Sequence, residues 1–183
     1  MLERITAEDF ESLYLLIKTS FPPTERRTKE GQRALFDTEK VYQVYGSKNE
    51  ETSAVEAFLA VWELDSVLFL EHFAVDPNLR GKGLGSRLLC ELAGMSDKPL
   101  CLEVEPPLND IAKRRIEFYK RNGFFLNEYP YIQPSLAKGQ PPIPLMVMTY
   151  GHAVDQNGFE KIRDELYKRV YHVEPMPKAD GAH

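Results

Sequence analysis

The chain has 183 residues, of which 43% are apolar and 28% are charged, and its net charge is −5. These values are typical of a globular domain, and we expect one domain over residues 1–173 with a flexible tail at 174–183. No basic stripe favours nucleic acid, and no basic amphipathic helix favours a membrane surface. No run is apolar enough to span a bilayer and the N-terminus is unlike a targeting peptide, so we expect a cytoplasmic protein.

The N-terminal segment predicts two helices. Residues 6–9, Thr-Ala-Glu-Asp, have the form of a capping box, and apolar residues then recur at helical spacing as far as Pro22-Pro23. Residues 24–39 predict a polar loop and a short second helix. Arg26 and Arg27 in that loop are predicted to lie on the solvated surface.

Three strand-like runs follow, at 41–45, 54–64 and 67–75. The polar stretches between them are short, so an antiparallel meander is the simplest connection. The third run is apolar except for Glu71 and His72. Side chains alternate along a strand, which predicts that these two residues point to opposite faces of the sheet.

A glycine-rich bend, residues 80–86, follows the third strand and leads into a helix predicted over 83–93. Glycines let a ligand approach the backbone closely, and the free N–H groups and positive dipole end of a helix attract anions. Arg80 and Lys82 add positive charge at the same place. The bend therefore predicts a site for a ligand that carries phosphate.

The C-terminal half predicts a strand at 100–104, a helix at 111–122, a strand from Phe124, a strand at 145–150 and a helix from Phe159 to Val170. The strand–helix–strand unit ending at residue 104 fits a right-handed parallel crossover. Residues 129–144 contain five prolines and predict an irregular loop. The two cysteines have neither CxxC spacing nor histidines nearby, so we expect no metal site.

Two other phosphate-binding motifs fit the bend poorly. A P-loop requires a glycine followed by Lys-Ser or Lys-Thr, and the chain has none. A dinucleotide fingerprint would begin at Gly81 and Gly83 but has Ser86 at its last position, although Glu103 matches the spacing of the ribose-binding acid. That fingerprint also follows its strand directly, whereas Arg80 comes five residues after the strand end.

Three stretches together resemble the GNAT superfamily of acyl-CoA-dependent N-acyltransferases. They are Phe73-Ala74-Val75-Asp76-Pro77, then Arg80-x-x-Gly83-x-Gly85, and finally Phe118-Tyr119-Lys120-Arg121-Asn122-Gly123-Phe124 at the end of a helix that Glu105 to Asn109 open. The resemblance covers residues 41–150 in the order of the elements. It implies an α/β (α+β) fold, with a central mixed, mostly antiparallel sheet, flanking helices and a splayed parallel pair of strands at 67–75 and 99–104.

The resemblance implies that acetyl-CoA is the acyl-donor cosubstrate, with its pyrophosphate on the bend and its pantetheine between the splayed strands. The Val75 N–H would bind the thioester carbonyl. Many relatives place a pantetheine-binding asparagine seven residues before the tyrosine, where this chain has Ala112; Asn109 lies ten before and either contacts CoA or caps the helix. The implied cosubstrate-binding residues are Phe73, Ala74, Val75, Arg80, Gly81, Lys82, Gly83, Leu84, Gly85, Ser86, Asn109 and Tyr119.

Three residues are candidates for the chemistry. Tyr119 matches the tyrosine that protonates the departing thiolate in many relatives, and its structural alternative is a core tyrosine. Glu71 interrupts an apolar strand, and Glu103 resembles the glutamate base of ribosomal-protein acetyltransferases. Either carboxylate is a candidate general base, with a structural ion pair or a solvated strand end as the alternative. His72 is predicted to be a hydrogen-bonded core histidine or a surface histidine.

The expected function is transfer of an acetyl group from acetyl-CoA to a primary amine of a small molecule or peptide, by direct attack in a ternary complex. The alternative is a non-catalytic acyl-CoA-binding or regulatory module of the same fold. The acceptor site would be built from the first helices and the 129–144 loop, in which Tyr129, Tyr131 and Gln133 either form a wall for the amine or fix the loop. The oligomeric state stays open, and a homodimer is compatible with the sequence.

Overall fold

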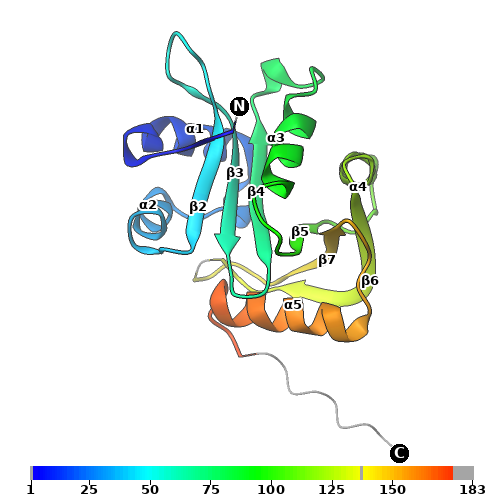
Figure 1. The fold of residues 1–183 in the computed structure, drawn as a ribbon. Coiled ribbons are helices and arrows are strands. Elements are labelled where there is room, and N and C mark those ends of the chain that lie inside the picture. Colours follow the sequence, from blue (N-terminus) through cyan, green and yellow to red (C-terminus); the bar gives the residue numbers. More distant parts are fainter. Residues whose placement is uncertain (1, 137, 175–183) are drawn as a thin grey trace, which may run out of the picture.

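The computed structural model describes residues 2–136 and 138–174, which form one seven-stranded sheet in the order β1-β2-β3-β4-β5-β7-β6 with helices on both faces (Figure 1). The strands are β1 Glu3–Arg4, β2 Tyr42–Lys48, β3 Val55–Glu63, β4 Leu68–Val75, β5 Leu100–Val104, β6 Phe124–Gln133 and β7 Ile143–Tyr150. The helices are α1 Phe10–Ser20, α2 Lys29–Thr38, α3 Leu84–Ala93, α4 Asp110–Arg121 and α5 Gln156–Arg169.

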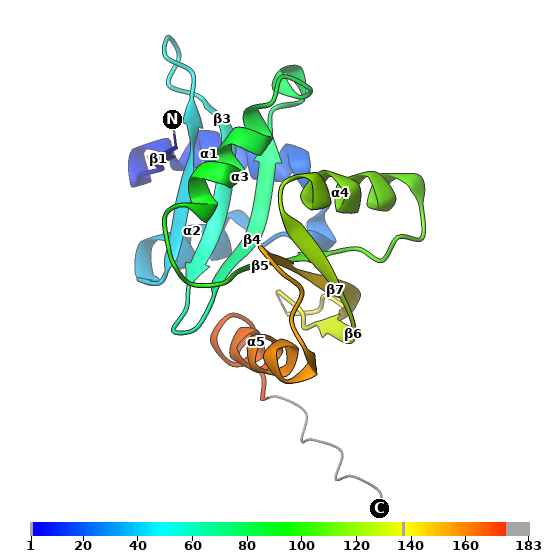
Figure 2. The ribbon, with the colours of Figure 1, turned by 45° about the vertical axis from the view of Figure 1, so that its right-hand side comes forward.

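Only one pair of neighbouring strands in this sheet is parallel, β4 with β5; the other described pairs are antiparallel. The β4–β5 register runs from Leu68 opposite Leu100 to Leu70 opposite Leu102 and then stops, although both strands continue. The mixed sheet, the meander and the splayed parallel pair predicted from the sequence are therefore confirmed. Figure 2 shows β4 leaning away from the half of the sheet that holds β5, β7 and β6.

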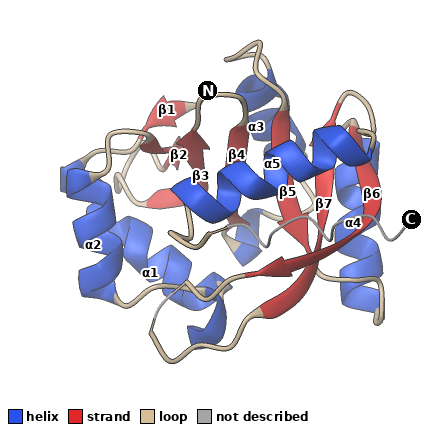
Figure 3. Cartoon of the chain, turned by 90° about the horizontal axis from the view of Figure 1, so that it is seen from below, coloured by secondary structure: helices blue, strands red, loops and turns tan. Residues whose placement is uncertain are grey.

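The two faces of the sheet carry separate hydrophobic cores. Helices α1, α2 and α5 cover one face, where Phe10, Trp62 and Leu166 belong to the same buried cluster. Helices α3 and α4 cover the other face, where Leu88 and Ile116 pack with side chains of β3, β4 and β5. In Figure 3, α5 runs across the strands on the first of these faces. The point where β4 and β5 separate therefore lies between two helical layers.

Short polar side chains define where the helices begin. The Thr28 hydroxyl accepts a hydrogen bond from Gly31 N–H at the start of α2 (3.1 Å), and Asp155 accepts one from Gly158 N–H at the start of α5 (2.8 Å). The capping box predicted at Thr6 is present and precedes α1. Each such cap satisfies a backbone donor that the helix itself leaves free and contributes about 1 kcal/mol.

A β-bulge in β4 corrects the predicted orientation of its two polar residues. Ala60 of β3 pairs with His72 and the next residue, Val61, pairs with Leu70, so Glu71 has no partner opposite it. An extra residue of this kind shifts the alternation of side chains by one position. Glu71 and His72 consequently lie on the same face, with the His72 Nδ1 3.3 Å from a Glu71 oxygen. The prediction that they point to opposite faces was wrong.

The prediction of solvated arginines between α1 and α2 was also wrong. The Arg27 side chain is only 11% exposed because it reaches into the sheet and pairs with Glu71. Arg26 donates from Nε to the Phe21 carbonyl (3.1 Å) and from Nη1 to the Tyr14 hydroxyl (3.0 Å). The segment is polar in sequence because it supplies partners to buried groups.

The irregular loop predicted at 129–144 is shorter than expected. Strand β6 continues to Gln133 and β7 begins at Ile143, with a register shift between Asn127 and Tyr131 that accommodates Pro130. A bulge and an edge position both tolerate a proline, which removes one ladder donor. The predicted tail lies outside the described residues from position 175 onward.

Candidate active site

Glu71 and Glu103 stand at the point where β4 and β5 separate. The last paired residues of the two strands are Leu70 and Leu102, so each glutamate is the first residue beyond the parallel ladder. Both carboxylates lie on the face covered by α1, α2 and α5, since the residues that bond them belong to that layer. The structure thus brings the two candidate bases of the sequence to one place.

The Glu71 carboxylate forms a buried ion pair. Arg27 Nη1 and Nη2 donate to its two oxygens at 2.7 and 2.8 Å, and its side chain is 1% exposed. Burial alone would raise the pKa of Glu71, but the Arg27 guanidinium and the neighbouring His72 hold that pKa well below its usual range. Glu71 therefore stays ionised and has little affinity for a proton at neutral pH.

Within residues 2–136 and 138–174, the Glu103 carboxylate is hydrogen-bonded by neutral donors only. Gln133 Nε2 donates to Glu103 Oε2 at 2.7 Å, and the Tyr131 hydroxyl donates to Oε1. The Tyr171 hydroxyl lies 2.9 Å from Oε1 and 2.8 Å from Oε2. Burial raises the pKa of Glu103 to about 7, against the lowering effect of these hydrogen bonds. A carboxylate whose pKa lies near neutrality is suited to accept and release a proton under working conditions.

Tyr119 lies on the opposite face of the sheet. It is 9% exposed and packs edge-on against Phe118 and Phe124 in the core under α3 and α4. Burial raises the pKa of its phenol to about 12, so the hydroxyl keeps its proton at neutral pH. No group among residues 2–136 and 138–174 hydrogen-bonds that hydroxyl. Phe118 also stacks on Phe73 of β4, which ties α4 to the edge of the splay.

The glycine-rich bend offers a row of free backbone donors. Gly81 and Gly83 have φ of 77° and 79°, in the left-handed region that favours glycine, and a Cβ at either would meet only open space. In the part of the chain that the structure describes, the N–H groups of residues 81–86 meet no acceptor. Together with the exposed Arg80 and Lys82, this is the arrangement that binds phosphate groups.

The direction of the Val75 N–H follows from its neighbour. Asp76 N–H donates to the Glu56 carbonyl of the β3 side (2.7 Å), and successive N–H groups of an antiparallel strand point to alternate sides. The Val75 N–H therefore points away from β3, toward the open side of the splay. Its carbonyl faces the same way and accepts a hydrogen bond from Arg80 Nε at 3.0 Å, which anchors the bend to the strand end.

Asn109 is the N-cap of α4, and its Oδ1 accepts a hydrogen bond from Ala112 N–H at 2.8 Å. Ala112, which stands where many relatives have asparagine, is buried at 1% exposure. The capping alternative for Asn109 is therefore present in the structure, and its oxygen is engaged in it.

Sequence reasoning missed two functional candidates, Arg27 and Tyr171. Arg27 lies in a polar loop without a motif and Tyr171 follows the last helix, so no local sequence pattern identifies either residue. The one available signal was Glu71 itself, since a carboxylate on a buried strand needs a positively charged partner. Of the tyrosines assigned to the loop, Tyr131 reaches Glu103, whereas Tyr129 stacks on Phe159 of α5 at 4.9 Å.

Comparison with known proteins identifies the family of the chain. The family model described as an acetyltransferase (GNAT) domain matches residues 41–125. A solved structure from Bacteroides thetaiotaomicron, described as "Putative acetyltransferase from GNAT family", is 34% identical with a TM-score of 0.85, over 95% of this chain and 99% of that one. The chain belongs to the GNAT acetyltransferase family. Within this family, "Putative acetyltransferase YjbC" of Bacillus subtilis is 32% identical, over 61% of this chain and 55% of that protein.

More distant GNAT structures share the fold. Arabidopsis thaliana NAA60 in complex with acetyl-CoA is 17% identical with a TM-score of 0.61, over 82% of this chain and 97% of that one. The ribosomal-protein-S18-alanine N-acetyltransferase from Escherichia coli is 18% identical with a TM-score of 0.58, over 85% of this chain and 95% of that one. At these identities the likeness concerns the fold of the chain alone.

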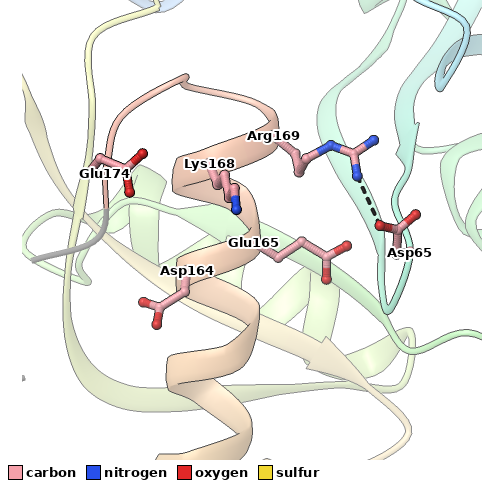
Figure 4. A pocket seen from close by; sticks show the side chains of 6 residues that line it. All are labelled: Asp65, Asp164, Glu165, Lys168, Arg169 and Glu174. Carbon is pink, nitrogen blue, oxygen red and sulfur yellow. Dashed lines mark hydrogen bonds and ion pairs between the residues drawn. The ribbon is translucent and has the colours of Figure 1, made fainter.

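A shallow hollow beside the C-terminal end of α5 is a separate feature (Figure 4). It lies near the start of β4, at the other end of that strand from the glycine-rich bend. The hollow is lined by Asp65, Asp164, Glu165, Lys168, Arg169 and Glu174.

Among the described residues, no group of histidine, cysteine and carboxylate side chains could hold a metal ion, and no helix has the length and apolarity required to cross a membrane.

Proposed function

We propose that this GNAT protein transfers the acetyl group of acetyl-CoA to a primary amine of a small molecule or peptide by direct attack in a ternary complex. The observation that carries the proposal is the placement of Glu103 and Tyr119. Glu103 is the first residue beyond the β4–β5 ladder and lies on the α1–α2–α5 face, whereas Tyr119 lies on the α3–α4 face of the same sheet. A base and an acid on opposite faces of one sheet suit a reaction in which the acceptor amine approaches from one face and acetyl-CoA from the other.

The donor side is built by the bend and the strand edges. Six free N–H groups at 81–86, with Arg80 and Lys82, suit the pyrophosphate of CoA, and the unpaired edges of β4 and β5 offer partners for the pantetheine amides. Because these N–H groups have no acceptor among the described residues, they are available to the phosphate oxygens of acetyl-CoA. A thioester carbonyl at the strand end would accept a hydrogen bond from Val75 N–H.

The chemistry follows from the protonation states. Glu103 removes a proton from the acceptor ammonium, and the free amine attacks the thioester carbonyl carbon. The oxygen of the tetrahedral intermediate is stabilised by Val75 N–H. The C–S bond then breaks, the sulfur takes the Tyr119 phenol proton, and the phenolate is neutralised by the proton that the new amide nitrogen releases through water. Glu71, held ionised by Arg27, contributes to structure and to the local field.

Titration calorimetry with acetyl-CoA, followed by thiol release with a panel of amines, tests the proposal. We expect saturable binding and release with at least one amine. Binding without release for every amine would instead support a non-catalytic acyl-CoA-binding module, and no binding would exclude both functions.

The acid role of Tyr119 has a sharper test. Tyr119→Phe should lower kcat about 100-fold, because an unprotonated thiolate is a poorer leaving group. Tyr45→Phe, which removes a hydroxyl that bonds Glu63 on the far part of the sheet, is the matched control. An unchanged rate for Tyr119→Phe across the pH range would reduce Tyr119 to a core residue.

A further inference from the structure

We propose that Tyr171, in the segment after α5, is a positioning residue that holds the Glu103 carboxylate ready to accept the proton of the acceptor amine. This inference rests on the proposed function and extends it to a part of the chain outside the matched family region. The family model ends at residue 125, and all the side chains that donate to Glu103 lie beyond that position.

The geometry distinguishes Tyr171 from the other donors. Its hydroxyl oxygen lies 2.9 Å from one Glu103 oxygen and 2.8 Å from the other, so it bridges the carboxylate. Gln133 Nε2 donates to the Tyr171 oxygen at 3.1 Å as well as to Glu103 at 2.7 Å. Because Gln133 supplies a donor to the phenol oxygen, the Tyr171 proton is left to point at the carboxylate.

The end of α5 fixes the tyrosine in this place. Tyr171 N–H donates to the Leu166 carbonyl at 3.2 Å, and Val173 N–H returns to the Tyr167 carbonyl at 2.9 Å. His172 between them has φ of 55°, the left-handed turn that commonly ends a helix. The Tyr171 ring is 7% exposed and belongs to the core of the α1–α2–α5 face. Because the Tyr171 side chain is held in place by these contacts, its hydroxyl can fix the orientation of the Glu103 carboxylate.

In the described part of the chain, no positively charged side chain hydrogen-bonds the Glu103 carboxylate. The nearby guanidinium of Arg27 is committed to Glu71, and Glu71 itself opposes ionisation of Glu103. Burial favours the protonated form of Glu103, and the hydrogen bonds from these neutral donors favour its ionised form. The titratable and charged groups around Glu103 are Glu71 of β4 with its partner Arg27, Cys101 of β5, Tyr131 of β6, Tyr167 of α5 and Tyr171.

The experiment compares Tyr171→Phe with the wild type and with the control Tyr45→Phe. The control removes a hydrogen bond of 2.9 Å between the Tyr45 hydroxyl of β2 and Glu63 of β3. The profile of kcat/KM against pH is measured for each, with one accepted amine. Independently, the pKa of Glu103 is measured by NMR of the δ-carbon in protein labelled at glutamate, with Glu103→Gln to assign the signal. Circular dichroism checks that each variant is folded.

We expect Tyr171→Phe to raise the pKa of Glu103 by about one unit, because a hydrogen bond that favours the ionised form is lost. The acidic limb of kcat/KM should move to higher pH by the same amount, with rates converging toward the wild type in alkali. The Tyr45 variant should shift neither. The positioning role is overturned if the pKa of Glu103 measured by NMR is unchanged in Tyr171→Phe, or if kcat/KM falls by the same factor at every pH.

The two proposals fail differently. If Glu103→Gln keeps the full rate, Glu103 is not the base, and the proposed mechanism fails whatever Tyr171 does to the NMR pKa. If Glu103→Gln is inactive but Tyr171→Phe moves neither the NMR pKa nor the limb, the base assignment stands and only the inference about Tyr171 is wrong.

Discussion

Glu71 and Glu103 occupy equivalent positions on the two strands that separate, yet their surroundings differ in one respect. Glu71 faces a guanidinium, and the pKa of its carboxyl is held well below the ordinary range. Glu103 faces two phenols and an amide, and burial raises the pKa of its carboxyl to about 7. The same residue type at the same depth is therefore a permanent charge in one case and a titrating group in the other.

The comparison shows that burial alone does not select a general base. Burial disfavours both carboxylates, but a bidentate arginine more than reverses the effect for Glu71, whereas neutral hydrogen bonds only reduce it for Glu103. Among the described residues, Arg27 from the segment between α1 and α2 pairs with Glu71 of β4, and no arginine bonds Glu103 of β5.

The largest effect concerns activity. Glu103→Gln should lower kcat about 100- to 10,000-fold, since the amide cannot take a proton from the acceptor. Glu71→Gln should lower kcat far less in protein shown to be folded. Thiol release at saturating acetyl-CoA measures both. The reverse order of the two effects would make Glu71 the base and break the comparison.

The next effect concerns stability. Glu71→Gln or Arg27→Met should each lower the free energy of unfolding by about 3–5 kcal/mol, because either leaves one buried group of the ion pair without its partner. Urea denaturation at pH 7 provides the measurement. The double variant Arg27→Met with Glu71→Met should recover much of the loss, as no buried charge remains. Equal losses for single and double variants would contradict a paired role.

The pH dependence of stability gives a smaller effect. The pKa of Glu103 is about 7 in the folded state and 4.5 ordinarily, so the folded state binds its proton more tightly. The corresponding stabilisation is complete below about pH 4.5 and is lost as the pH rises through about 7. From pH 4 to pH 8, the wild type should lose about 2–3 kcal/mol relative to Glu103→Gln. Parallel stability profiles would show that Glu103 titrates normally.

The order of elements from residue 41 to 150 could be predicted because its signals are local. Alternating apolar strands, the turn at Asp76-Pro77, the glycine bend and Gly123 after α4 each depend on neighbouring residues alone. The errors have equally physical causes. A bulge depends on how two strands pair, so it was invisible at Glu71, and the continuation of β6 past Pro130 depended on its position at the sheet edge.

The family, the glycine-rich bend and three candidate groups, Glu71, Glu103 and Tyr119, can be recognised from the sequence alone. The tertiary structure pairs Glu71 with a guanidinium and surrounds Glu103 with neutral donors. Arg27 meets Glu71 across 44 positions and Tyr171 meets Glu103 across 68, and no local pattern encodes contacts between residues so far apart. Because the pKa of a buried group depends on the charges and donors that the fold brings beside it, the division between a structural and a titrating glutamate exists only in the folded chain.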